Sequence, residues 1–553
     1  MVEEPLASLN LPFDLASLLS FTLADPFAQT LANSSCNDFF ESYTTEDGSG
    51  RIRVSLKEQR GGWGALPLEW REYFHTFKEP AARSDLLEQL TSLEISTPTT
   101  CDFPPSLQTF LNSCRSHSFD RTCSLDPILS YPPNHRSQPS LSKAAPLHTQ
   151  VSKTPALEGL KGKAKAHHLN ALKAGQSPKK QHEVVKFCAL VESMLQEERC
   201  SYCVDVGSGR AHLSRALASP PLDLHVLALD WSSSQKSGAE KLDQIRTKAE
   251  LNPTIGSLTH RVNSLDEPGV RKVLEEWPPS STNDEDVPAG KRSPALLVAL
   301  HACGDLTPDS IKAFTDFSRK STNLDSLPRA VFVGCCYNLQ TPSLFPLSKS
   351  IESLLGNPQD LALPNPNEPI SLAQLRLTPQ SPPTWHLDAS STRAFLSATS
   401  KLAYRSRLEA ELEWNGFGIE IGERKVGRIP DCKDWEEYRG KAIERMRIKE
   451  GDQRSSSGLS EPCRFGEEED EGKSWEEGLF FLRVWWTIRS WLGPPLESLV
   501  VLDRYLLLVE GLYRKEKEKG DSIESRERRR RVDMVNIFDQ ATGSLRNIAL
   551  VVR

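Results

Sequence analysis

Apolar runs that alternate with helical patterns fill the central part of the chain. Helical periodicity begins at 177–178, where Ser and Pro suit the start of a helix, and returns at 237–251. The runs that we interpret as strands are 202–206, 224–230, 258–262, 295–300, 330–333 and 547–552. Strands that alternate with helices predict an α/β fold with a Rossmann-like, doubly wound and mostly parallel sheet. Ligands of such sheets bind at the carboxyl ends of the strands.

Composition predicts how the rest of the chain is divided. Residues 1–115 mix short helical patterns with turns, which indicates a small N-terminal, mainly helical domain. Residues 116–156 are rich in Ser and Pro and are expected to form a linker, and 157–553 would form the main domain. Within the main domain we expect disordered insertions near 278–294, 357–383, 450–478 and 515–531.

The overall composition excludes several classes of protein. The net charge of −7 means that any surface for nucleic acid must be local rather than general. The 12 cysteines lack the regular spacing of a disulfide scaffold, which favours a reducing compartment, the cytoplasm or the nucleus. Neither a signal peptide nor an uninterrupted membrane span is expected.

A strand, a glycine turn and the start of a helix follow one another from 202 to 217. Gly207 suits the positive φ that such a turn needs, and Gly209 lets the backbone approach a ligand closely. Asp230 ends the next strand, where a carboxylate can accept hydrogen bonds from ribose hydroxyls. Asp205 precedes the glycines and would repel a phosphate, but it suits a ligand that carries a sulfonium group.

These residues predict S-adenosylmethionine as the cofactor. Its ribose would lie on Asp230, its methionine end near Asp205, Gly207 and Gly209, and its adenine near Asn263. The alternative is a crossing from strand to helix that binds no ligand.

A basic segment precedes the glycine turn. Residues 159–186 hold seven lysines against one acid, Glu183. Such a run could attract the phosphates of RNA, or it could be a solvated face with no ligand. His182 and the lysines beside it are candidates for contact with a cofactor or a substrate.

Five motifs occur in one order along the chain: Lys-Lys-Gln-His-Glu-Val at 179–184, Asp-Val-Gly-Ser-Gly at 205–209, Leu-His-Ala-Cys-Gly-Asp-Leu at 300–306, Val-Gly-Cys-Cys-Tyr at 333–337 and Glu-Ser-Leu-Val-Val-Leu-Asp-Arg at 497–504. Together they resemble the methyltransferase-like protein 25 family, also described as ribosomal-RNA-adenine-dimethylase-domain-containing proteins. The resemblance implies a class I S-adenosylmethionine-dependent methyltransferase. It also implies cofactor contacts at Lys180, His182, Glu183, Ser208 and His301.

The motif at 301–305 suggests the type of acceptor. Amino-directed adenine methyltransferases usually have Asn or Asp before Pro-Pro-aromatic here, whereas this chain has His-Ala-Cys-Gly-Asp. The His-x-Cys-Gly pattern with a later Cys-Cys pair resembles transfer-RNA ribose 2′-O-methyltransferases instead. A hydroxyl acceptor needs a base, and we expect His301 and Asp305 to be catalytic. Alternatively, His301 caps a turn and Asp305 starts the next helix.

The cysteines near His301 are candidates for metal ligands. Neighbouring residues in an extended chain point to opposite faces, so Cys335 and Cys336 are not expected to share one ion. Cys200 and Cys203 form a C-x-x-C with no second pair nearby. The sequence therefore predicts no metal site.

The function predicted from these residues is methyl transfer from S-adenosylmethionine, with RNA as the acceptor through a ribose hydroxyl or a base. Two alternatives stay open, and each uses the same fold. One is a catalytically inactive protein that binds RNA or a protein partner, and the other is a protein methyltransferase.

Overall fold

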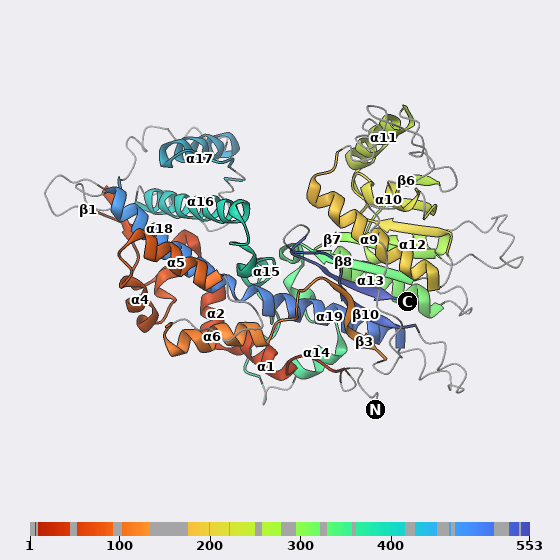
Figure 1. Ribbon diagram of the computed structural model, residues 1–553, viewed down its shortest axis with the longest axis horizontal. Coiled ribbons are helices and arrows are strands. Elements are labelled where there is room, and N and C mark those ends of the chain that lie inside the picture. The colour runs from red at the N-terminus through yellow and green to blue at the C-terminus, as the bar shows by residue number, and fades with distance from the viewer. Residues whose placement is uncertain are drawn as a thin grey trace, which may run out of the picture. The chain divides into compact units, whose positions relative to one another are not determined.

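The computed structural model divides the chain into two compact units (Figure 1). The first unit comprises 1–20, 117–379 and 495–553, and the second comprises 21–116 and 380–494. The residues that the structure describes are 6, 9–44, 52–91, 102–132, 175–197, 200–219, 222–248, 257–277, 295–320, 329–356, 361–414, 426–427, 429–450, 464–465, 471–513, 530–540 and 544–553.

The first unit is built on an eight-stranded sheet with the order β3-β10-β11-β8-β7-β4-β5-β6. The strands are β3 (Ser124–Tyr131), β4 (Tyr202–Val206), β5 (His225–Asp230), β6 (Leu258–Val262), β7 (Ala295–Cys303), β8 (Arg329–Cys335), β10 (Val532–Asn536) and β11 (Ile548–Val552). Neighbours from β6 to β8 are parallel, whereas β11 is antiparallel to both β8 and β10. The predicted doubly wound, mostly parallel sheet is confirmed.

The order of the strands locates the ligand-binding edge of this sheet. The chain runs outward from β4 through β5 to β6, and then returns to place β7 and β8 on the other side of β4. The topological switch point therefore lies between β4 and β7. Ligands of open α/β sheets bind at the carboxyl ends of the strands beside such a point.

Helices cover both faces of the sheet. Those of the first unit are α1 (Leu15–Leu19), α9 (Pro178–Glu197), α10 (His212–Leu217), α11 (Ser233–Lys248), α12 (Glu267–Glu276), α13 (Leu306–Lys320), α14 (Lys349–Leu355), α15 (Leu372–Leu377) and α19 (Gly493–Tyr513). The apolar side of α9 packs with Val331 and Val333 in one core cluster. Phe332, which points to the opposite face, contacts Phe314 of α13 with ring centroids 5.9 Å apart. The two helices thus lie on opposite faces.

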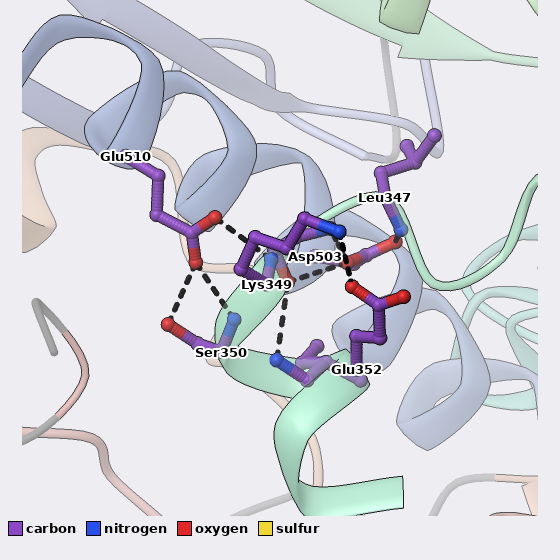
Figure 2. A network of polar contacts seen from close by, with 8 residues as sticks. Leu347, Lys349, Ser350, Glu352, Asp503 and Glu510 are labelled. Atoms are coloured by element: carbon purple, nitrogen blue, oxygen red, sulfur yellow. Dashed lines mark hydrogen bonds and ion pairs between the residues drawn. The ribbon is translucent and has the colours of Figure 1, made fainter. Parts of the chain in front are cut away.

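Two carboxylates of α19 hold the start of α14 (Figure 2). Asp503 accepts hydrogen bonds from the backbone N–H groups of Leu347 (2.8 Å) and Ser348 (2.9 Å), and from the Ser348 hydroxyl (2.7 Å). Two turns further on, Glu510 accepts from the backbone N–H groups of Lys349 and Ser350 at 2.8 and 2.9 Å. These contacts satisfy N–H groups that a helix start leaves without partners of its own.

The second unit is mainly helical. Its helices are α2 (Pro26–Asn33), α3 (Gly61–Gly64), α4 (Leu68–His75), α5 (Pro80–Thr91), α6 (Pro105–Ser116), α16 (Ala389–Trp414), α17 (Trp435–Glu450) and α18 (Glu471–Ser490), with a small sheet of β1 (Phe40–Thr44), β2 (Ile52–Leu56) and β9 (Arg464–Phe465). Trp63 is fully buried against Phe481 of α18, with ring centroids 4.7 Å apart. Segments far apart in sequence therefore share one core, and the units do not coincide with the predicted boundaries at 115 and 157.

Parts of two segments that we expected to be disordered are ordered. Residues 361–383 contain α15, which begins with a capping box at Ser371 and buries Leu375 and Leu377. Within 450–478 the structure has β9 and the start of α18. The prediction was wrong there because composition alone does not show which apolar side chains find a core. Residues 278–294 lie outside the described residues, as do 514–529.

In the part of the chain that the structure describes, no helix has the length and apolar character needed to cross a membrane.

Candidate functional site at the carboxyl edge of the sheet

The turn between β4 and α10 has the conformation that its glycines predict. Gly207 has a φ of +73° and Gly209 a φ of +54°, and both values favour glycine. A Cβ on Gly207 would lie 2.9 Å from Cδ2 of Leu306, so an added side chain would also displace the end of that leucine. A Cβ on Gly209 would meet no described atom within 4 Å. Gly209 therefore exposes bare backbone to open space, as a site for a closely held ligand requires.

Asp230 lies against this turn. Its Oδ2 accepts a hydrogen bond from the Gly209 N–H at 2.8 Å, and its Oδ1 accepts one from the Ser232 N–H at 2.9 Å. Each carboxylate oxygen has a second lone pair, so both can still accept a bond from a ligand hydroxyl. The side-chain nitrogen of Asn263 donates to the backbone oxygens of Ser264 and Gly269. Asn263 directly follows β6. Its backbone N–H donates to the Asp230 carbonyl, which places Asn263 next to the end of β5.

Asp205 lies beneath the turn and is buried. The Ser214 hydroxyl of α10 donates to its Oδ2 at 2.6 Å, a contact that the sequence analysis did not predict. Burial raises the pKa of Asp205 to about 6, although the Ser214 hydrogen bond and the charge of Lys180 act in the opposite direction. At neutral pH this carboxyl is thus mainly ionised and can attract a positive group.

Helix α9 brings a buried glutamate to the same edge. It begins at Pro178, as predicted, with Ser177 accepting the Lys180 backbone N–H at 3.3 Å. Glu183 is only 2% exposed, and its Oε2 lies 2.7 Å from Nε2 of His301 and 3.8 Å from Nζ of Lys180. His182 lies beside Glu183 and is half-buried.

The positive groups around Glu183 favour its ionised form. Burial acts to raise the pKa of Glu183, but its hydrogen bond with His301 and the nearby positive charges outweigh burial, so the pKa is lowered. Burial lowers the pKa of Lys180, and Glu183 and Asp205 offset part of that effect. Among the described residues, Oε1 of Glu183 is buried without a hydrogen-bond partner. A buried acceptor of this kind is costly unless a ligand or water reaches it.

His301 sits at an irregular position of β7. The register between β7 and β8 shifts between Leu300 and Ala302, and His301 has a φ of +64°. Such a bulge turns a side chain away from its regular direction, and bulges are frequent beside active sites. The strained backbone thus directs the imidazole toward Glu183, which lies 118 positions earlier in the chain.

Asp305 makes a different contact from the one we expected. Its Oδ1 accepts the Thr341 N–H at 2.9 Å, and its Oδ2 accepts the Thr341 hydroxyl at 2.7 Å. It also precedes α13, and its carbonyl accepts the Asp309 N–H. The carboxylate therefore anchors the loop that follows β8, and its catalytic role stays a prediction.

Three thiols come together at the ends of β7 and β8. The Sγ atoms of Cys303, Cys335 and Cys336 all lie within 4.8 Å of one another. The expectation that Cys335 and Cys336 face opposite ways was wrong, because Cys336 has a φ of 45° and is not extended. A hydrogen bond with Cys335 lowers the pKa of Cys303 to about 6, against the effect of burial. Cys200 and Cys203 do not belong to this or any similar cluster of described residues.

Arg504, at the end of the motif at 497–504, packs against the turns that follow β7 and β8. Arg504 is buried and donates to the Gly304 carbonyl at 3.3 Å and to Oε1 of Gln340 at 2.7 Å. Its guanidinium carbon lies 4.7 Å from the centre of the Tyr337 ring. A Cβ on Gly334 would lie 2.4 Å from Nη1 of Arg504, which explains the glycine at that position. The motif is therefore structural.

Of the basic segment, the structure describes only the C-terminal part. Lys179, Lys180 and Lys186 lie on α9, and the lysines from 161 to 173 lie outside the described residues.

Comparisons with known proteins identify one family model and two solved structures that resemble parts of this chain. A family model described as a methyltransferase domain matches residues 179–342, which contain β4 to β8 and the site. An S-adenosylmethionine-dependent methyltransferase from Clostridium acetobutylicum is 18% identical, with a TM-score of 0.16 over 30% of this chain and 55% of that chain. The chain thus spans about half the length of that protein. The O-methyltransferase NcsB1 from neocarzinostatin biosynthesis, solved with S-adenosylhomocysteine and 1,4-dihydroxy-2-naphthoic acid, is 14% identical over 57% of this chain and 77% of that chain, also with a TM-score of 0.16.

The strand order shows a Rossmann-like α/β sheet, and residues 179–342 of this sheet and its helices match the methyltransferase-domain model.

Proposed function

We propose that this protein transfers a methyl group from S-adenosylmethionine to RNA, with His301 as the group that accepts the proton of the acceptor. The observation that carries the proposal is the convergence of two features at one sheet edge. One is the glycine turn with Asp230 at its side, and the other is the buried pair of Glu183 and His301. The strands that end in these features are β4, β5 and β7, on both sides of the switch point.

The residues at the turn fit S-adenosylmethionine. The open space at Gly209 suits a ligand in close contact with the backbone. Asp230 would accept hydrogen bonds from the ribose, and Asp205 contributes a negative charge near the methionine end. Glu183 offers Oε1 as a further acceptor. When bound, S-adenosylmethionine supplies a methyl group on a sulfonium, which is ready for displacement by a nucleophile.

The role of His301 follows from its contact with Glu183. A lowered pKa keeps Glu183 ionised, and an ionised carboxylate only accepts hydrogen bonds. Nε2 of His301 therefore carries the proton that Glu183 accepts, which leaves Nδ1 as the ring nitrogen able to take a proton. We assign Glu183 as a positioning residue that fixes this tautomer, and His301 as the base for a ribose hydroxyl. Displacement at a methyl carbon needs little more than correct placement of the acceptor.

RNA is the proposed acceptor because basic side chains lie beside the site. Lys179, Lys180 and Lys186 lie on α9, which also carries Glu183. Lysines attract phosphates in a manner that weakens as the salt concentration rises. A base of the RNA is the alternative acceptor to the ribose hydroxyl.

The test uses the full chain, radiolabelled S-adenosylmethionine and RNA from cells that lack the protein. We expect label that is removed by ribonuclease and not by protease. His301→Ala should abolish transfer and keep the dissociation constant for the donor in calorimetry. The matched control is His225→Ala, because His225 starts β5 at the opposite edge of the sheet and bonds Ser257.

The other outcomes separate the alternatives. Label in protein alone would favour a protein methyltransferase and contradict the RNA acceptor. Failure to bind the donor would favour a binding protein without activity. Full transfer by His301→Ala would contradict the role of the imidazole.

A further inference from the structure

The cluster of three thiols is not used by the proposed methyl transfer. Cys303 is the last residue of β7 and Cys335 the last residue of β8, and the two are direct partners across the parallel pair. Their Sγ atoms are 3.2 Å apart. Cys336 follows at once and brings its Sγ within 4.8 Å of both.

Two local backbone features create this arrangement. The left-handed conformation of Cys336, with a φ of 45°, turns its side chain to the same side as that of Cys335. The turn is held because the Leu339 N–H donates to the Cys336 carbonyl at 2.8 Å. On the other strand Gly304 has a φ of +56°, and a Cβ there would lie 2.5 Å from the Leu339 carbonyl oxygen. The turns after β7 and β8 thus pack directly on each other and fix the positions of the three sulfurs.

We propose that Cys303, Cys335 and Cys336 bind one soft divalent metal ion of the zinc class through their three sulfur atoms. Zinc binds thiolate sulfur at about 2.3 Å in a tetrahedral arrangement, which places two sulfurs of one site about 3.8 Å apart. The observed separation is 3.2 Å for one pair and at most 4.8 Å for the others, so all three are within about 1 Å of that value or shorter. Small side-chain rotations would therefore complete the geometry.

The surroundings suit a thiolate centre. Three thiolates and a divalent ion carry one net negative charge, and the guanidinium of Arg546 acts electrostatically on both Cys303 and Cys336. Cys335 is buried, whereas Cys303 is exposed, so an ion could enter from solvent. A metal site needs ligands that are held in place and a path by which the ion can enter, and the buried Cys335 and the exposed Cys303 meet these two needs.

The fourth coordination position would be open. Among the residues that the structure describes, no further Cys, His, Asp or Glu side chain joins the three sulfurs. Zinc centres with three protein ligands keep the fourth position for water or a bound molecule, whereas structural sites are closed by four ligands. The proposed site is thus of the open kind, two residues after His301.

Metal binding can be measured without methyl transfer, so its outcome is separate from that of the proposed function. The reduced, full-length protein is treated with a chelator, reloaded with Zn²⁺ or Co²⁺ and desalted. We expect one metal ion per chain by inductively coupled plasma mass spectrometry. The Co²⁺-loaded protein should also show a sulfur-to-cobalt charge-transfer band in its absorption spectrum. Zn²⁺ should also protect three thiols from alkylation.

Variants identify the ligands. Changes to residues beside a metal's ligands cost about 10–100-fold in affinity, so removal of a ligand itself should weaken binding at least about tenfold. We expect this loss in Cys303→Ser and in Cys336→Ser, neither of which is in the fully buried core. The matched control is Cys200→Ser, a half-buried cysteine of the same unit, which should keep the metal.

Three results would overturn the proposal. The first is the absence of a sulfur-to-cobalt charge-transfer band after the reduced wild-type protein has been loaded with Co²⁺. The second is equal metal content in wild type, Cys303→Ser and Cys336→Ser. The third is a disulfide between Cys303 and Cys335 that persists under reducing conditions and leaves a single thiol.

Discussion

Replacing Asp230 by alanine tests the proposed cofactor site most directly. The substitution removes the acceptors of two backbone N–H groups, those of Gly209 at 2.8 Å and Ser232 at 2.9 Å. It also removes the carboxylate that would bind the ribose. We therefore expect two separable effects: a less stable glycine turn and weaker binding of the donor.

The magnitudes follow from the energies of hydrogen bonds to charged groups, about 1.5–3 kcal/mol each. A loss of about 2 kcal/mol in binding corresponds to a dissociation constant about 30-fold larger. A ligand at 100 times its dissociation constant stabilises the folded state by about 2.7 kcal/mol. At the same ligand concentration, a 30-fold weaker variant would gain only about 1 kcal/mol.

Calorimetry with S-adenosylmethionine and thermal unfolding with and without it measure both effects. Asp243→Ala is the matched control. Asp243 is a carboxylate on α11 of the same unit, and it binds His260 at 2.6 Å and also Arg215. This control should lower the melting temperature and leave the affinity for the donor unchanged. A folded Asp230→Ala protein whose dissociation constant lies within twofold of wild type would refute the assignment of Asp230.

Two further predictions concern the turn and the support of α14. Gly207→Ala should destabilise the protein by at least about 1–2 kcal/mol in urea denaturation, because of its positive φ and the contact with Leu306. Gly209→Ala carries a similar backbone cost, but its Cβ would point into open space, so it should in addition weaken donor binding; equal donor affinity in Gly209→Ala and wild type would contradict this. Burial raises the folded-state pKa of Asp503 to about 6, above an unfolded value of about 4. Protonation of Asp503 therefore favours the folded state, and its contribution to the free energy of unfolding should rise as the pH falls from 7 to 4. Two pH units correspond to about 3 kcal/mol, and Asp503→Asn should remove that part of the slope in unfolding at several pH values; an unchanged slope would show that another group titrates.

Local sequence was enough to predict the features that depend on neighbouring residues. Six strands of the central sheet, the helix start at Ser177-Pro178 and the positive φ of Gly207 were predicted and are confirmed. The two antiparallel strands β3 and β10 were not predicted, and β3 lies within the predicted linker at 116–156. Each follows from hydrophobic periodicity or from a residue's own backbone preference, and such effects act over a few positions. The site at the strand ends was predicted for the same reason, because strand order and glycine spacing limit where a ligand can bind.

Tertiary structure alone decided which distant residues meet. Glu183 and His301 are 118 positions apart and touch only because α9 packs on the face of the sheet beside β7. The thiols of Cys335 and Cys336 converge because packing against Gly304 accommodates a left-handed residue that no local pattern predicted. Likewise, 361–383 are ordered although they are rich in proline, because their apolar side chains reach a core. Sequence patterns describe the preferences of each segment, whereas burial and contact between segments depend on the whole fold.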